Sequence, residues 1–252
     1  MRPRAIALTG AIAYAAFLVA TVPASWLAAR VAAASEGSME LEDPQGTLWA
    51  GHARAAITSA AGTVAIDRVQ WRFAPAELAA GRLAFDFTAA GRGLDARARI
   101  GRGFSEWMAG PVSASLDASL AAAAVPLLAA WHPEGRIRVD APNLHWNEAG
   151  EASGTAHLTW DGAMVSLSDV RPLGRYALDA AADRGPATLT VTTVEGPLRI
   201  AGKGSFSPPS RLAFSGEARG EGPDAGALEP LLNLIGPRRA DGSRPIELRA
   251  GS

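Results

Sequence analysis

The chain has 252 residues and a formal net charge of −1, with 24 basic and 25 acidic side chains. This balance gives no electrostatic reason to expect nucleic acid as a partner, and no polybasic segment points to lipid headgroups. Cysteine is absent, which excludes disulfides, a lipoprotein-type acyl anchor, thiolate zinc sites and cysteine nucleophiles.

The first element in chain order is a run without charged side chains, residues 5–29. It is longer than the roughly 20 residues that a helix needs to cross a bilayer core, which predicts a transmembrane anchor. Arg2 and Arg4 precede it, so the positive-inside rule places residues 1–4 in the cytoplasm and residues 30–252 outside. Trp26 lies near the expected outer boundary, where interfacial Trp is favoured. A cleaved secretory signal is the alternative, but its apolar core would be only about 7–15 residues long.

After an expected linker, residues 30–45, apolar side chains alternate with polar ones. A period of two with one apolar face predicts half-buried strands, and Gly and Pro punctuate them at short intervals. The alternating stretches are residues 83–88, 94–100, 112–118, 136–140, 155–160, 189–192 and 246–249. The turn signals are residues 91–93, 101–103, 110–111, 185–186, 196–197 and 202–204. Strands joined by such short turns predict a mainly β, antiparallel meander of about a dozen strands.

Two segments, residues 119–131 and 224–235, break the alternation and predict two short helices. Asp224 is expected to cap the start of the second. Each segment contains Pro-Leu-Leu, at a spacing of 104 residues, and each is followed by a strand with alternating charges. The order therefore predicts either one large β domain or two similar sheet-and-helix units, residues 46–141 and 143–250.

No catalytic constellation is recognisable in the sequence. It lacks a nucleophile elbow, a phosphate loop and a complete dinucleotide fingerprint. The four histidines are far apart, none pairs at i, i+4, and the acidic residues are scattered singly. We therefore expect no enzyme, and we expect no metal, cofactor or small-molecule substrate.

Tryptophans recur beside the expected turns, and two interpretations of them remain open. They either fill a core that is otherwise rich in alanine, which we favour, or some of them are exposed anchors for another protein, since Trp is enriched at interface hot spots. The tryptophans concerned are Trp49, Trp71, Trp107, Trp131, Trp146 and Trp160.

The most specific short string is Gly46-Thr47-Leu48-Trp49-Ala50-Gly51. It is followed by Trp71-Arg72-Phe73-Ala74-Pro75 and Gly81-Arg82-Leu83. Further short strings of the same family pattern stand at residues 173–176, 196–198, 202–204 and 231–236. In this order the strings resemble the type II secretion system protein N family over nearly the whole chain. The candidate partner-binding residues are Gly46, Thr47, Leu48, Trp49, Gly51 and Trp71, and the candidate membrane-interface residues are Arg2, Arg4 and Trp26.

This resemblance implies a non-enzymatic, single-pass component of the cell inner membrane of a Gram-negative bacterium, with most of the chain in the periplasm. It would link the inner-membrane platform of the type II secretion machine to the outer-membrane secretin, and its N-terminal helix would contact the lipid bilayer. A second hypothesis is an AsmA-like or lipopolysaccharide-bridge-like protein, whose one-sided sheet would carry lipid acyl chains in an open groove. The prevalence of alanine on the alternating apolar positions argues against that second hypothesis.

Overall fold

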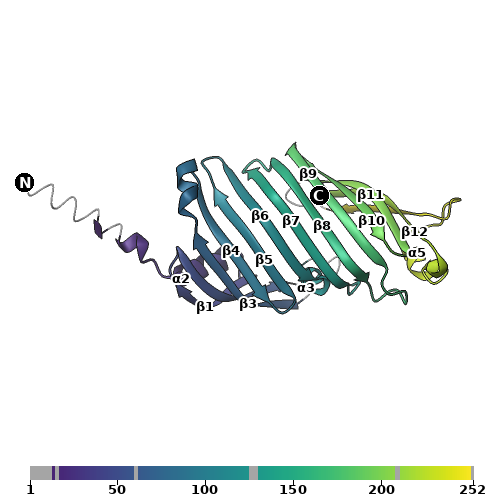
Figure 1. Cartoon of the computed structure of the whole chain (residues 1–252), viewed down its shortest axis with the longest axis horizontal. Coiled ribbons are helices and arrows are strands. Elements are labelled where there is room, and N and C mark those ends of the chain that lie inside the picture. Colours follow the sequence, from purple (N-terminus) through teal and green to yellow (C-terminus); the bar gives the residue numbers. More distant parts are fainter. Residues whose placement is uncertain (1–12, 15–16, 60–61, 125–129, 208–210, 251–252) are drawn as a thin grey trace, which may run out of the picture.

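The computed structural model describes residues 13–14, 17–59, 62–124, 130–207 and 211–250. Within these residues thirteen strands form one antiparallel sheet in strict chain order, so each strand pairs with its sequence neighbours (Figure 1). The strands are β1 (Met39–Gly46), β2 (Ala50–Ser59), β3 (Gly62–Phe73), β4 (Leu83–Gly91), β5 (Leu94–Arg102), β6 (Glu106–Asp117), β7 (Glu134–Asn147), β8 (Ala152–Met164), β9 (Gly174–Gly185), β10 (Ala187–Glu195), β11 (Leu198–Ser207), β12 (Arg211–Gly220) and β13 (Arg244–Ala250). The expected mainly β antiparallel meander is confirmed.

Few helical elements accompany the sheet. They are α2 (Ala24–Ala34), η1 (Pro75–Ala80), α3 (Ala118–Ala124), η2 (Pro223–Ala225) and α5 (Glu229–Ile235). The first expected helix corresponds to α3, although residues 125–129 lie outside the described residues. The second is split, and Asp224 does not cap it, because it lies in η2 while the N-cap of α5 is Leu228. Pro230 explains the later start: proline is favoured in the first turn of a helix, where its missing N–H needs no partner.

Two of the expected turns lie inside strands. Gly110 belongs to β6, and a Cβ there would lie 2.3 Å from the carbonyl oxygen of Pro142 on β7. Gly202 belongs to β11, and a Cβ there would lie 2.5 Å from the ring of Phe214 on β12. These glycines therefore permit close approach between neighbouring strands and mark no chain reversal.

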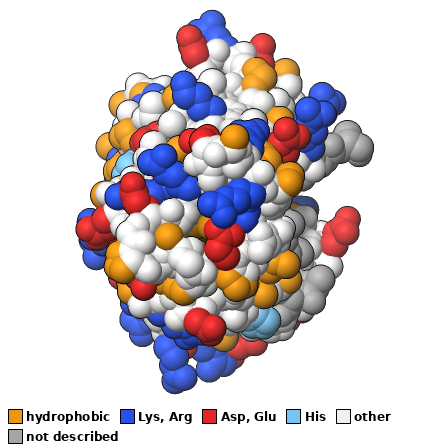
Figure 2. Space-filling model, turned by 90° about the vertical axis from the view of Figure 1, so that its right-hand side faces the viewer, with side chains coloured by type: hydrophobic (Ala, Val, Ile, Leu, Met, Phe, Trp, Pro, Cys, Tyr) orange, Lys and Arg blue, Asp and Glu red, His pale blue; other side chains and the backbone are white. Residues whose placement is uncertain are grey.

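The two faces of the sheet differ in chemistry. Residues that pair directly across an antiparallel ladder project to the same face. One face carries apolar pairs such as Phe85–Ile100 and Val139–Leu158, and the other carries polar pairs such as Asp86–Arg99. Figure 2 shows the end of the molecule that holds α5 and β12, where acidic and basic side chains are mixed among hydrophobic ones. The alternation of apolar and polar residues in the sequence thus corresponds to one apolar face that continues across the sheet.

Helices cover the apolar face at the two ends of the sheet. Near the N-terminus, Ala24 of α2 packs with Ala53 and Trp71. Near the C-terminus, α5 contributes Leu231 and Leu232 to a second cluster, whose other buried members are Val165, Leu173, Leu198, Ala218 and Leu228. Between them, α3 contacts β2 and β3 as well as β6 and β7. A seven-residue helix can reach both strand pairs only if the sheet curves around it, so the apolar face is concave at that end.

The expected anchor and domain boundaries fall as follows. Among the described residues no helix is long and apolar enough to cross a membrane. Much of the 5–29 run, together with Arg2 and Arg4, lies outside the described residues. The expected 30–45 linker holds the end of α2 and most of β1. The expected boundary between two units at residues 141–143 falls inside β7, which pairs with both β6 and β8, and the two-unit organisation stays a prediction.

Candidate functional site at the N-terminal junction

The string at residues 46–51 forms the turn that joins β1 to β2. Gly46 has a φ of 93°, and a Cβ there would lie 2.5 Å from the carbonyl oxygen of Ala50. The backbone N–H of Thr47 donates to that same oxygen at 2.9 Å. The Thr47 hydroxyl oxygen accepts from the N–H groups of Trp49 at 3.3 Å and Ala50 at 3.2 Å. Glycine and threonine therefore close a tight turn and stabilise it with a side chain.

Trp71 of β3 lies directly beneath this turn. Its side chain is only 3% exposed, and its indole Nε1–H donates to the backbone oxygen of Thr47 at 3.0 Å. Gly51 pairs with Trp71 across β2 and β3, and a Cβ on Gly51 would lie 2.5 Å from the indole ring. Gly51 leaves the room that the indole needs to lie against the strand. Trp71 thus belongs to the core and supports the turn from below.

Trp49, at the tip of the turn, is half-buried in an aromatic cluster. Its ring lies edge-on to Phe73 at 5.2 Å and stacks on Phe85 at 6.3 Å. Phe85 in turn lies 6.3 Å from Phe87, which packs against the buried N-terminal cluster. Such offset and edge-on pairs are favourable beyond the area they bury. The cluster joins the turn to β3 and β4.

The same turn binds the segment that precedes α2. The Trp49 indole donates to the backbone oxygen of Val19 at 2.7 Å, and the Leu48 N–H donates to that of Val22 at 2.8 Å. Pro23 forms an isolated antiparallel bridge with the turn. These three attachments fix where the N-terminal segment meets the sheet. We call residues 19–23 and 46–51 together the N-terminal junction.

Helix α2 continues the junction across the apolar face. Ala24 is buried and Leu27 packs on the same cluster as Trp71. Trp26 points away and is about half exposed, with the guanidinium of Arg30 4.9 Å from its ring centroid. The expected role of Trp26 at a membrane interface stays a prediction, as does that of Arg2 and Arg4.

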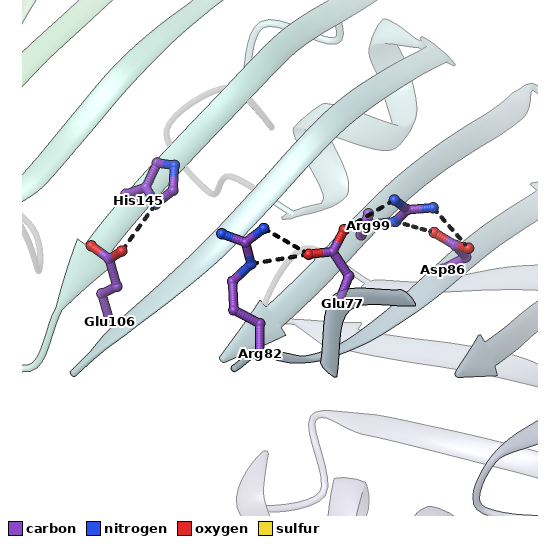
Figure 3. Close-up of polar contacts among 6 residues, drawn as sticks. All are labelled: Glu77, Arg82, Asp86, Arg99, Glu106 and His145. Atoms are coloured by element: carbon purple, nitrogen blue, oxygen red, sulfur yellow. Dashed lines mark hydrogen bonds and ion pairs between the residues drawn. The ribbon is translucent and has the colours of Figure 1, made fainter. Parts of the chain in front are cut away.

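An ion-pair network that the sequence reasoning missed lies at the same end of the strands as the junction. Figure 3 shows its four members, Glu77, Arg82, Asp86 and Arg99. Glu77 of η1 contacts Arg82 at 2.9 Å and Arg99 of β5 at 3.3 Å. Arg99 also donates twice to Asp86 of β4, at 2.7 and 3.2 Å, and these hydrogen bonds raise the pKa of the guanidinium above its ordinary value. Glu77 thereby holds η1 against β4 and β5. Only the pairing of β4 with β5 brings these charges together, so single positions in the sequence carried no signal for them.

No grouping in the described residues suggests a metal centre. The described side chains include no group of three or more His, Cys, Asp or Glu that could hold a metal ion. The nearest pairs are His145 with Glu106 at 3.6 Å and His157 with Asp179 at 2.7 Å, each on neighbouring strands. The junction is therefore the best candidate site, and its chemistry is that of attachment and contact.

Residues 37–247 match the family model described as Type II secretion system (T2SS), protein N. The chain belongs to the type II secretion system protein N family. The match begins after α2 and ends within β13, so it contains the 46–51 turn, Trp71 and the ion-pair network, and it confirms the resemblance drawn from the sequence. No curated protein and no solved structure matches the chain.

Proposed function

We propose that this member of the type II secretion system protein N family is a single-pass inner-membrane protein whose sheet lies in the periplasm. There it links the inner-membrane platform to the outer-membrane secretin through contacts rather than catalysis. Family membership supports a place in the secretion machine. The charge-free run at 5–29, preceded by Arg2 and Arg4, supports the anchor and its orientation. Its last part, from Val19 to Leu27, is the segment that attaches to the sheet.

The observation that carries the proposal is the N-terminal junction. The six-residue string that best marks the family resemblance is the turn that holds residues 19–23 against the sheet. A tether that is hydrogen-bonded to its domain fixes the place of that domain above the membrane better than a free linker does. The sheet then extends from this point through twelve strand spacings of about 4.8 Å, a path of about 58 Å along its width. Such length suits a protein that carries contacts outward from the inner membrane.

Crosslinking in native membranes tests the linking role. Because the natural chain has no cysteine, single cysteines can be placed along the polar face and coupled to a photo-crosslinker. We expect capture of a secretin or of a platform protein of the secretion machine. Capture of lipid-transport proteins alone would refute the linking role and favour the lipid-carrying hypothesis.

The anchor has a separate test. A reporter that is active only in the periplasm, fused after residue 252, should give signal, and the protein should stay with inner membranes after a high-salt wash. Release of a shortened soluble species would show that the N-terminal run is a cleaved signal.

A further inference from the structure

A cluster of exposed apolar side chains lies at the same strand end as the junction. Phe104, in the loop between β5 and β6, is 97% exposed. Leu78 of η1 and Leu83 of β4 are about half exposed, and Ile100 of β5 is also exposed. One edge of the Phe104 ring lies near Gly81, where a Cβ would lie 3.2 Å from it, so the loop tip lies beside the end of η1. We call these four side chains, Leu78, Leu83, Ile100 and Phe104, the strand-end patch.

The register places this patch beside the entry of the N-terminal segment. Ala50 pairs with Arg72, Phe73 with Phe85, and Leu83 with Arg102, so the 46–51 turn, η1 and the Phe104 loop share one end of the sheet. Three strand spacings separate β2 from β5, about 14 Å across the sheet. In Figure 1 the N-terminal segment leaves the molecule on the left, beside α2 and at the side of the sheet formed by β1 to β4.

The side chains around the patch suit a bilayer surface. The guanidinium of Arg102 lies 4.9 Å from the ring centroid of Trp107, which stacks on Trp146 at 6.4 Å with an interplanar angle of 7°. Trp near the boundary, with Arg beside it and an apolar side chain at a loop tip, is the composition favoured at membrane interfaces. Arg82 and Arg102 are paired with glutamates and remain partly exposed, so both can face headgroup phosphates.

A lipid surface is favoured over a protein partner because a second group of exposed apolar side chains lies at the same end of the sheet. Tyr14, Phe17, Leu18 and Val19, which lead into the junction, are all about half or more exposed. These residues belong to the 5–29 run expected in the membrane. The strand-end patch lies about three strand spacings across the sheet from the place where that run meets the domain.

We propose that the strand-end patch rests on the outer surface of the inner membrane, with Phe104 inserted at headgroup level. This inference rests on the proposed anchor. With the anchor alone the sheet could rotate about the junction, whereas a second contact about 14 Å away fixes its tilt. The sheet then holds a defined direction relative to the membrane, which a linking protein needs.

Site-specific fluorescence on the full-length chain tests this proposal. Phe104→Cys supplies the test position, and Arg92→Cys, in the β4–β5 turn at the opposite end of β5, supplies the matched control. The two positions are separated by the length of β5, about 27 Å. Each variant is coupled to a polarity-sensitive dye and reconstituted into phosphatidylethanolamine–phosphatidylglycerol vesicles, with and without nitroxide-labelled lipid. We expect a blue-shifted emission at 104 and severalfold stronger nitroxide quenching than at 92.

The outcomes separate this proposal from the anchor. Vesicles that carry the chain but give equal or no quenching at both positions would overturn the membrane contact and leave the anchor intact. A probe at 104 that is shielded from both lipid nitroxide and aqueous iodide would show a protein contact and would also overturn it. A chain that fails to float with vesicles would overturn the anchor, and this inference with it.

A second variant guards against effects of the label. Phe104→Asp alters a side chain that is almost fully exposed, so a wild-type far-UV spectrum is expected. In that background a probe at Leu83→Cys should lose most of its lipid quenching. Unchanged quenching at 83 would contradict the role given to Phe104.

Discussion

Trp71→Ala should be the most damaging single substitution at the N-terminal junction. Its side chain is 3% exposed, and replacing a buried Trp or Phe by Ala costs about 3–5 kcal/mol. The substitution also removes the indole donor to the Thr47 oxygen, a hydrogen bond with a net contribution of about 1 kcal/mol. Because the two losses overlap, we expect about 4 kcal/mol in total. For a chain of this size each kcal/mol lowers the Tm by about 2–4 °C, which predicts a decrease of about 8–16 °C.

Thermal unfolding followed by far-UV circular dichroism on the full-length chain measures this decrease. Trp131→Ala is the matched control, because the Trp131 side chain is 45% exposed and an exposed substitution changes stability by about 1 kcal/mol or less. Trp71→Phe helps to separate the two causes, since it removes the indole donor while it keeps a large aromatic ring in place. A Trp71→Ala chain that melts with the Trp131→Ala control would refute the supporting role of Trp71.

Three further predictions follow from named contacts. Trp49→Ala should lower both the Tm and the cellular protein level, and by less than Trp71→Ala does, because Trp49 is only half-buried. A variant with a wild-type Tm that no longer supports secretion would instead show that Trp49 binds a partner. Burial raises the pKa of Tyr176 above its usual range, so the unfolded chain ionises first and stability should fall above about pH 10. Tyr176→Phe should therefore flatten that alkaline decrease in urea titrations, and an unchanged slope would contradict the assignment. Glu229→Gln should lower the free energy of unfolding by about 2–3 kcal/mol, because it removes the counter-charge of the buried Arg244. Arg244→Met should lower it by less, since it also removes two buried nitrogens, Nε and Nη1, that have no hydrogen-bond partner. Equal Tm values for these two variants would argue against this assignment.

Alternation located the strands because the sheet has one apolar face throughout. The stretches at 83–88, 94–100 and 155–160 fall inside β4, β5 and β8, and most of their apolar members pair with apolar neighbours, as Phe85 does with Ile100 and Leu158 with Leu178. Gly and Pro were less reliable signals. Glycine permits a tight turn, but at Gly110 and Gly202 it permits two neighbouring strands to approach closely. The sequence alone does not distinguish these two roles of glycine.

The candidate site was found in the sequence but not understood from it. The 46–51 string stood out, yet its role depends on Trp71, 24 residues from Thr47, and on Val19, 30 residues from Trp49. β1 was missed for a related reason. Its Glu, Asp and Pro residues and its bulge obscure the alternation, so the sequence pattern predicts a linker there. The curvature that brings α3 against β2 and β3 is a long-range contact with no local signal.

The composition of the two edge strands indicates where partners can bind. Within the part of the chain that the structure describes, β1 and β13 each pair with a strand on one side only, and an open strand edge invites pairing with another chain. Half of β1 consists of residues that oppose such pairing: Glu40, Glu42, Asp43 and Pro44. β13 carries Pro245, Glu247 and Arg249. Charges, proline and a bulge at these edges disfavour edge-to-edge association of copies. A chain protected in this way is suited to contacts through its polar face and its strand ends, and the junction and the strand-end patch both lie at one such end.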